Sequence, residues 1–208
     1  MFYFIKTPRW LRKLYKSCVW EMPANEKIIY LTFDDGPIPE ITDFVLNQLK
    51  IYKAEATFFC IGKNVMEFPE IYKRIITDGH AVGNHTFNHM DGWKTKDEVY
   101  LSNIEAAKKL IDSRLFRPPY GKITKFQIRA LANKKYQLTP IMWTVLSGDF
   151  DAKFPPAKCL QNVLKYTDSG SIVVFHDSEK AAPNMKYALP EVLRIFSEKG
   201  YRFEKIYL

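Results

Sequence analysis

The stretch Ile28-Ile29-Tyr30-Leu31-Thr32-Phe33-Asp34-Asp35-Gly36-Pro37 joins an apolar run to two adjacent acids and a Gly-Pro break. The run predicts a buried strand, and the break ends the strand with both acids at its carboxyl end. Because adjacent strand residues point to opposite faces, the two acids can serve one site only if the backbone bends at Gly36 and Pro37. Alone, the motif fits an ordinary turn as well as a site with one acid for a metal and one for a proton.

Composition indicates a globular protein. The 208 residues are enough for one domain with a sizeable core. No apolar stretch approaches the roughly 20 residues of a membrane span, and the amino terminus lacks the apolar core of a secretory signal. We therefore expect a soluble, cytoplasmic protein. Three cysteines, odd in number and far apart, argue against a disulfide framework and predict buried free thiols.

The first segment carries most of the net charge of +8. Between residues 8 and 19, apolar and basic residues recur at helical spacing, which predicts an amphipathic helix with a basic face. This helix could dock on the domain by its apolar stripe, which is the favoured interpretation. Alternatively, residues 1–20 could contact an anionic membrane; no nucleic acid partner is expected. We divide the chain into this basic amphipathic segment, 1–26, and a main domain, 27–208.

Beyond this segment, strand-like apolar runs alternate with helical patterns. We expect strands at 28–33, 56–59, 81–84, 137–144, 171–175 and 201–207. We expect helices at about 40–52, 69–77, 96–112, 124–133, 156–166 and 184–199. This alternation predicts parallel βα units in a barrel or a doubly wound sheet, and in either architecture the carboxyl ends of the strands carry the chemistry.

Titratable side chains do follow four of the predicted strands. They are Asp34 and Asp35, His85 and His89, Asp149, and His176 with Asp177. The remaining histidine, His80, precedes a strand, so a structural or surface role is expected for it. The i, i+4 spacing of His85 and His89 places two imidazoles on one side of a helical turn, where they can bind a divalent ion. That spacing is a weak signal alone and a stronger one beside an Asp-Asp pair.

Four motifs in chain order carry a resemblance to a known family. They are Thr32-Phe33-Asp34-Asp35-Gly36-Pro37, His85-Thr86-Phe87-Asn88-His89, Arg117-Pro118-Pro119-Tyr120-Gly121 and Val174-Phe175-His176. Together they resemble the NodB-type polysaccharide deacetylases, carbohydrate esterase family 4, over roughly residues 28–208. The resemblance implies a distorted (β/α) barrel of about seven parallel strands, with 27–208 as the catalytic domain. It also implies metal-dependent removal of acetyl groups from sugars.

The resemblance further implies a role for each matching residue. Asp35, His85 and His89 would hold a divalent metal, usually zinc, with cobalt or nickel as alternatives. Asp34 would be the general base beside Arg117, and His176 the general acid beside Asp149. The backbone N–H of Tyr120 would help to hold the oxyanion.

Five aromatic residues near the predicted site could stack on sugar rings, although a chain with 15% aromatics must bury most of them: Phe87, Trp93, Tyr120, Trp143 and Phe150. We assign substrate contact to Tyr120, Phe150 and Trp143, of which Trp143 lies in an apolar strand and is the best candidate for a core residue. Phe150 stands where the family usually has tryptophan, so an aromatic wall is kept without an indole N–H. Val174 replaces the usual leucine, a minor core change.

The expected activity is removal of acetyl groups from an N-acetylglucosamine-containing poly- or oligosaccharide, of peptidoglycan or chitin type. The alternatives are an amidase acting on a non-sugar amide, an O-acetyl esterase, and a catalytically silent carbohydrate-binding relative. The presence of both a base and an acid counts against the silent relative. Because such polymers normally lie outside the cytoplasm, we expect either a soluble internal substrate or a membrane-peripheral enzyme held by its basic segment.

Overall fold

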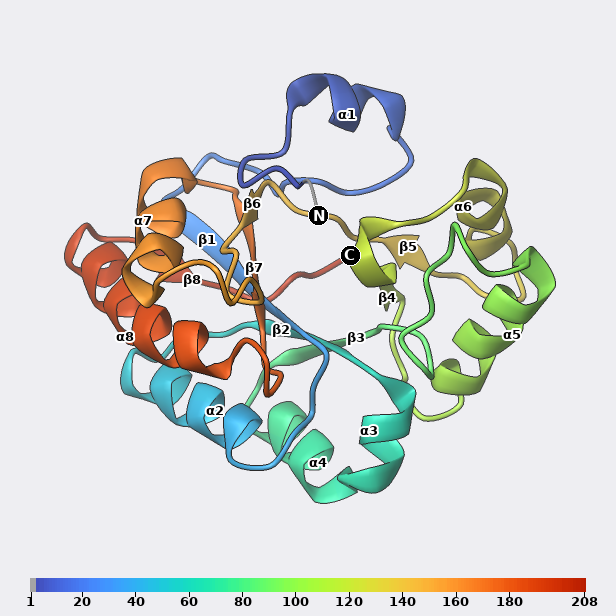
Figure 1. The fold of residues 1–208 in the computed structure, drawn as a ribbon, viewed down its shortest axis with the longest axis horizontal. Helices are drawn as coiled ribbons and strands as arrows, with labels where there is room; N and C mark the ends of the chain where they lie inside the picture. Colours follow the sequence, from blue (N-terminus) through green and yellow to red (C-terminus); the bar gives the residue numbers. More distant parts are fainter. Residues whose placement is uncertain (1–2) are drawn as a thin grey trace.

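The computed structural model describes residues 3–208 and contains one curled parallel sheet ringed by helices (Figure 1). The strand order is β5-β4-β3-β2-β1-β7-β6, and β8 adds to β1. The strands are β1 Ile28–Asp34, β2 Thr57–Cys60, β3 Ala81–Asn84, β4 Leu115–Phe116, β5 Thr139–Pro140, β6 Val145–Leu146, β7 Ile172–His176 and β8 Arg202–Phe203. The expected distorted barrel of about seven parallel strands is confirmed.

The helices cover the outside of this sheet. They are α1 Arg9–Leu14, α2 Ile41–Ile51, α3 Gly62–Glu67, α4 Pro69–Thr77, α5 Asp97–Lys108, α6 Lys125–Leu131, α7 Pro156–Tyr166 and α8 Ala182–Glu198. The helix α8 packs against both α2 and α7, and α2 buries Val45, Leu46 and Leu49 in the main core. In α2, apolar residues at helical spacing thus supply the face that packs into the core.

The strand β1 lies at the centre of the sheet and is buried along its whole length. Its register with β7 places Asp34 beside His176, at the carboxyl ends of the two strands. The Thr32 hydroxyl donates to the carbonyl of Val173 at 2.9 Å, which adds a side-chain bond to the ladder between the two strands. The parallel register therefore brings two of the predicted functional residues to the same edge of the sheet.

Of the predicted strand 137–144 only Thr139–Pro140, which is β5, forms a strand, because the sheet is open between β5 and β6. Pro140 cannot donate to a ladder, and the chain after Ile141 crosses from one edge of the sheet to the other. The amino-terminal segment follows this opening, which we call the seam. Val19 forms a bridge with Ile141, and Lys6 forms an antiparallel bridge with Val145.

The predicted helix over residues 8–19 is also shorter than expected. The helix α1 ends at Leu14, because Tyr15 leaves helical geometry with φ −120° and ψ 59°. Trp10 and Leu14 are 61% and 51% exposed, whereas Leu11 and Tyr15 pack against a buried cluster that contains Trp20. The apolar stripe is therefore divided between solvent and core. The division at residue 26 and membrane contact through residues 1–20, the first two of which lie outside the described residues, stay predictions.

Smaller departures from the sequence expectations concern short elements. The predicted strand 201–207 is reduced to the two residues of β8. The strand β4 and the helix α3 were not predicted, because two and six residues are too few to show a periodic pattern. The cysteines are free and buried as predicted, at Cys18, Cys60 and Cys159. His80 is buried with its ring 5.5 Å from that of Phe58. No helix within residues 3–208 is both long and apolar enough to cross a bilayer.

Candidate active site

The backbone after β1 makes the bend that the Asp34-Asp35 pair requires. Asp35 has φ 85°, in the left-handed region, so its side chain leaves the strand alternation. The next residue, Gly36, donates its N–H to Asp177 Oδ1 at 3.0 Å. A Cβ on Gly36 would lie 2.0 Å from Asp177 Oδ2, so no larger residue fits there without displacing that carboxyl group. The bend therefore depends on Gly36 and on Asp177, a buried acid that directly follows the neighbouring strand β7.

Asp34 forms a buried ion pair with Arg117. The Arg117 Nη1 atom lies 2.7 Å from Asp34 Oδ1 and 2.6 Å from the Thr32 hydroxyl. The other nitrogens of the guanidinium donate to the carbonyls of Ile141 and Met142, at 3.2 and 3.0 Å. Burial lowers the pKa of Arg117, and the charge of Asp34 opposes this shift. With every nitrogen of the fork bonded, Arg117 holds the Asp34 carboxylate in one orientation.

The side chains of Asp35, His85 and His89 converge on one point. Asp35 Oδ1 lies 3.1 Å from His89 Nε2 and 3.6 Å from His85 Nε2, and the three candidate ligand atoms lie within 4.8 Å of one another. Asp35 Oδ1 is buried, yet among residues 3–208 it has no hydrogen-bond partner of acceptable geometry. A buried carboxylate oxygen without a donor, beside two imidazole nitrogens, fits a divalent cation.

The outer nitrogens of both histidines are held by neighbouring groups. His85 Nδ1 lies 2.8 Å from the carbonyl oxygen of Arg117, so Nδ1 carries the proton and Nε2 faces Asp35 with its lone pair. His89 Nδ1 contacts the Tyr120 hydroxyl at 3.1 Å. Burial lowers the pKa of His85 to about 4, so the imidazole is neutral at pH 7. A neutral imidazole is the form that binds a metal.

The conformation predicted for the His85 and His89 motif was wrong, although the two rings do converge. Residues 85–89 form a loop, in which Thr86 and His89 have φ values of 63° and 55°. The side chain of Asn103 holds this loop by accepting from the N–H groups of Phe87 and Asn88. A loop with two left-handed residues, rather than a helical turn, thus brings the imidazoles together.

His176, whose side chain is 16% exposed, pairs with the buried Asp149. Its Nδ1 lies 2.8 Å from Asp149 Oδ1, and its backbone N–H donates to Asp149 Oδ2 at 2.7 Å. Burial acts to lower the pKa of His176, but the charge of Asp149 and its hydrogen bond raise the pKa to about 10. The imidazole is therefore positively charged at neutral pH.

Two of the three aromatic residues assigned to substrate lie beside histidines of the predicted site. The Tyr120 ring is 4.6 Å from that of His89 and is 53% exposed, and the Phe150 ring is 5.2 Å from that of His176. Trp143 instead packs against two buried clusters, with its ring 5.7 Å from the Arg117 guanidinium carbon. The structure therefore gives Trp143 a packing role and leaves its contact with substrate a prediction.

Sequence reasoning assigned no role to Asp177, which links three elements around the site. Its Oδ2 accepts from the Thr42 hydroxyl at 2.6 Å, and its own N–H donates to the Asp34 carbonyl at 3.0 Å. With the bond from Gly36, these contacts join β7, the bend after β1 and the first turn of α2. Burial raises the pKa of Asp177 to about 8. Its position directly after His176 at a strand end was the available signal.

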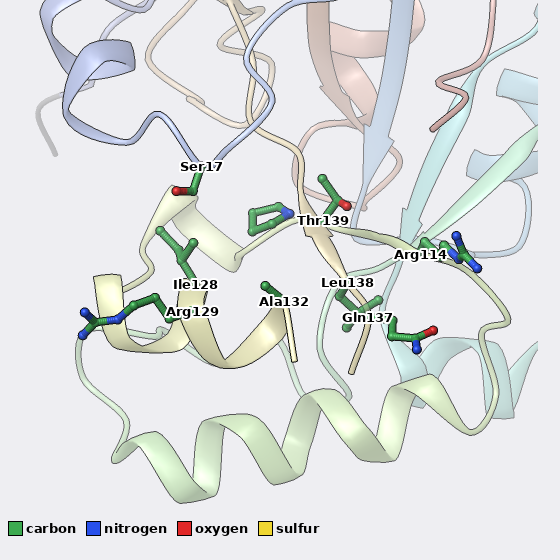
Figure 2. A pocket seen from close by; sticks show the side chains of 9 residues that line it. Ser17, Arg114, Ile128, Arg129, Ala132, Gln137, Leu138 and Thr139 are labelled. Carbon is green, nitrogen blue, oxygen red and sulfur yellow. The ribbon is translucent and has the colours of Figure 1, made fainter. Parts of the chain in front are cut away.

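A hollow of about 530 Å³ lies elsewhere, between α6, β5 and the amino-terminal segment (Figure 2). None of the predicted site residues lines it. Its two arginines, Arg114 and Arg129, point away from each other in Figure 2 and form no convergent anion site. The chemistry-bearing residues are therefore gathered at the carboxyl ends of the strands and not in this hollow.

Comparisons with known proteins agree with this arrangement. The family model for polysaccharide deacetylases matches residues 21–139. A peptidoglycan-N-acetylglucosamine deacetylase from Bacillus cereus is 38% identical over 190 residues, which cover 88% of each protein. A chitooligosaccharide deacetylase from Azorhizobium caulinodans is 38% identical over 161 residues, which cover 74% of this chain and 75% of that protein.

Similarity to a solved structure extends over almost the whole chain. A crystal structure of a peptidoglycan N-acetylglucosamine deacetylase, in complex with 4-naphthalen-1-yl-N-oxidanyl-benzamide, superposes with a TM-score of 0.86 at 29% identity. The match covers 96% of this chain and 95% of that one. The chain therefore belongs to the NodB-type polysaccharide deacetylases, hydrolases of carbohydrate esterase family 4.

Proposed function

We propose that the protein removes the N-acetyl group from N-acetylglucosamine residues of a poly- or oligosaccharide, of peptidoglycan or chitin type. One observation carries the proposal: a fixed carboxylate, Asp34, and a charged imidazole, His176, lie at neighbouring strand ends beside a cluster of three ligand-type side chains. Similar proteins named for peptidoglycan and chitooligosaccharide deacetylation support this range of substrates.

The cluster of Asp35, His85 and His89 would hold a divalent ion, zinc first, with cobalt and nickel as alternatives. When bound, such an ion polarises a carbonyl group and lowers the pKa of water. The protein residues around it prepare the ligands: the Arg117 carbonyl fixes the tautomer of His85, and the Tyr120 hydroxyl orients His89.

Asp34 would act as the general base. Its carboxylate, oriented by Arg117, takes a proton as water attacks the carbonyl carbon of the acetamide. The backbone N–H of Tyr120 would donate to the oxygen that becomes negatively charged. A fixed donor of this kind contributes on the order of 3 kcal/mol in comparable sites.

His176 would act as the general acid. Breaking the C–N bond releases acetate and an amine, and an unprotonated amine is a very poor leaving group. The charged imidazole supplies the proton through Nε2, since Nδ1 is bonded to Asp149. Asp149 thus keeps the acid charged and fixes which nitrogen faces the substrate.

The test is acetate release by the zinc-, cobalt- or nickel-reconstituted protein from matched N-acetyl and O-acetyl sugars and a non-sugar N-acetyl amide. We expect the N-acetyl sugars to be the best substrates. The Asp34→Asn variant should bind metal normally and lose turnover, because the amide cannot take the proton. Asp168→Asn is the matched control, at a largely exposed side chain that forms an ion pair with Lys6.

Two results would count against this proposal. Full turnover by Asp34→Asn would remove Asp34 from the role of base. A preference for O-acetyl sugars or for the non-sugar amide would replace the proposed substrate, and binding of oligosaccharide without any acetate release would indicate the silent relative.

A further inference from the structure

An exposed tryptophan, Trp93, lies on the loop between β3 and α5. Its surface is 60% exposed, yet the residue is held at both its ring and its backbone. The indole Nε1–H donates to the carbonyl of Ile123 at 3.1 Å, and the backbone N–H donates to Asp91 Oδ1 at 3.0 Å. The two segments that meet here precede α5 and α6 at the right of Figure 1. The ring is therefore both fixed and accessible.

The loop that carries Trp93 is itself anchored. The Gln127 side chain donates to the carbonyl of Gly92 at 2.9 Å, and Asp91 forms an ion pair with Lys122 at 2.6 Å. A Cβ on Gly92 would lie 2.5 Å from the carbonyl oxygen of Lys122, so the two segments are in close contact. Because these bonds already order the loop, the binding of a ligand that stacks on Trp93 does not incur the entropic cost of ordering the loop.

Trp93 also belongs to a row of side chains that reaches the metal cluster. The Lys122 ammonium lies 5.9 Å from the centre of the Trp93 ring and 5.5 Å from that of Tyr120. The Tyr120 ring then contacts His89 at 4.6 Å. Two exposed aromatic rings with an ammonium group between them thus lead outward from one of the three predicted metal ligands.

The other strongly exposed tryptophan shows that exposure alone does not mark a site. Trp10 is 61% exposed on α1, where its ring meets Phe4 edge to face at 6.4 Å. It has no described contact with the residues of the active site. The distinguishing features of Trp93 are its fixed ring, its anchored loop and its continuity with Tyr120 and His89.

We propose that Trp93 is a stacking platform for a sugar residue that flanks the residue being deacetylated. A pyranose ring presents a face of C–H groups, and tryptophan offers a large, rigid apolar face at low entropic cost. Lys122 and Asp91, beside the platform, would bind hydroxyl groups of the same sugar. The protein would then select an extended chain over a single N-acetylglucosamine. This inference rests on the proposed function, since it names the length of substrate that the site takes.

The test compares the zinc-loaded wild type with Trp93→Ala on N-acetylglucosamine and on its β-linked oligomers of two to six residues. We expect KM for the longer oligomers to rise about tenfold, the effect of losing one well-packed aromatic contact, with kcat nearly unchanged. Rates on the monosaccharide should not change. Trp93→Phe, which keeps a ring, should retain most of the affinity, and Trp10→Ala is the control at matched exposure.

A second measurement separates this inference from the proposed function. Titration calorimetry of the zinc-loaded Asp34→Asn protein, with and without Trp93→Ala, gives the Kd for the hexamer without turnover. If the wild type releases no acetate but Trp93→Ala still weakens hexamer binding about tenfold, the result supports the stacking platform and contradicts the proposed function. If Trp93→Ala and Trp93→Phe both leave hexamer KM and Kd unchanged, the platform is refuted.

Discussion

His85, which is buried, and His176, which is partly buried, both lie at strand ends of one site, and their proton affinities are shifted in opposite directions. The pKa of His85 is lowered to about 4, and that of His176 is raised to about 10. Burial lowers the pKa of each imidazole, so burial cannot explain the difference. The group that contacts Nδ1 explains the difference. His85 Nδ1 contacts the neutral carbonyl of Arg117, whereas His176 Nδ1 contacts the negatively charged carboxylate of Asp149, which favours the protonated ring.

The comparison shows how one residue type suits the two roles that we propose for it in one site. A histidine bonded to a carbonyl stays neutral and offers a lone pair at Nε2, as a metal ligand must. A histidine bonded to a carboxylate keeps its proton and can donate it at Nε2, as a general acid must. The group that contacts Nδ1 therefore decides which of the two proposed roles the Nε2 atom of each histidine can take.

Removing His85 should give the largest effect and tests the ligand half of the comparison. His85→Ala leaves two ligand-type side chains, so we expect metal content to fall to near zero and acetate release to reach background. Metal analysis after gel filtration, with acetate release on the same sample, checks both values. A variant with undiminished metal content would remove His85 from the ligand set.

Removing the acid should be severe but should spare the metal. We expect His176→Gln to lower kcat by about 10²–10⁴-fold, the usual contribution of a positioned general acid, with metal content unchanged. The contrast with His85→Ala, measured under identical conditions, separates the two roles. If both variants lost metal equally, the assignment of His176 as acid rather than ligand would fail.

Changing the partner instead of the histidine should give the smallest effect and a pH signature. In Asp149→Asn, His176 loses the charge that raises its pKa, so the fall in kcat at alkaline pH should begin at lower pH. If the pKa returned to 6.5, the charged fraction at pH 8 would drop about 30-fold, with little change at pH 5.5. An unshifted kcat profile would show that Asp149 does not set the pKa of His176.

The pair of His176 and Asp149 should also make the stability of the wild type depend on pH. The pKa of His176 is raised above its ordinary 6.5 on folding, so the folded state binds this proton more tightly. The resulting stabilisation is complete below pH 6.5 and is lost as the pH rises through about 10. Asp149→Asn should flatten the dependence of the unfolding midpoint on pH across this interval, which thermal unfolding in matched buffers measures.

The sequence predicted this site well where chemistry follows the ends of long buried strands. The apolar runs before Asp34 and His176 predicted the neighbouring buried strands β1 and β7, and parallel pairing then placed the two residues together. The conformation around His89 was out of reach, because i, i+4 spacing does not distinguish a helical turn from a loop with left-handed residues. Asp177 was also missed as a support, since its partners Gly36 and Thr42 lie more than 100 positions away.

The amino-terminal segment was the least predictable region. Periodicity reports an apolar face but not what covers it, so the early end of α1 and the exposure of Trp10 could not be read from the pattern. The end of strand pairing after Pro140 and the start of β6 at Val145 likewise involve contacts with a segment more than 100 residues earlier in the chain. Local sequence has no means of encoding such a distant partner.

The position of that segment along the seam has a consequence for the order of folding. Lys6 meets Val145 in a bridge, and the Tyr3 hydroxyl donates to Asp151, 148 positions away, at 2.7 Å. Contacts that close loops of this length form slowly, because the chain must lose its freedom before they add any stability. We therefore expect Tyr3 and Lys6 to reach their final places late in folding, after the strands between them and their partners have paired.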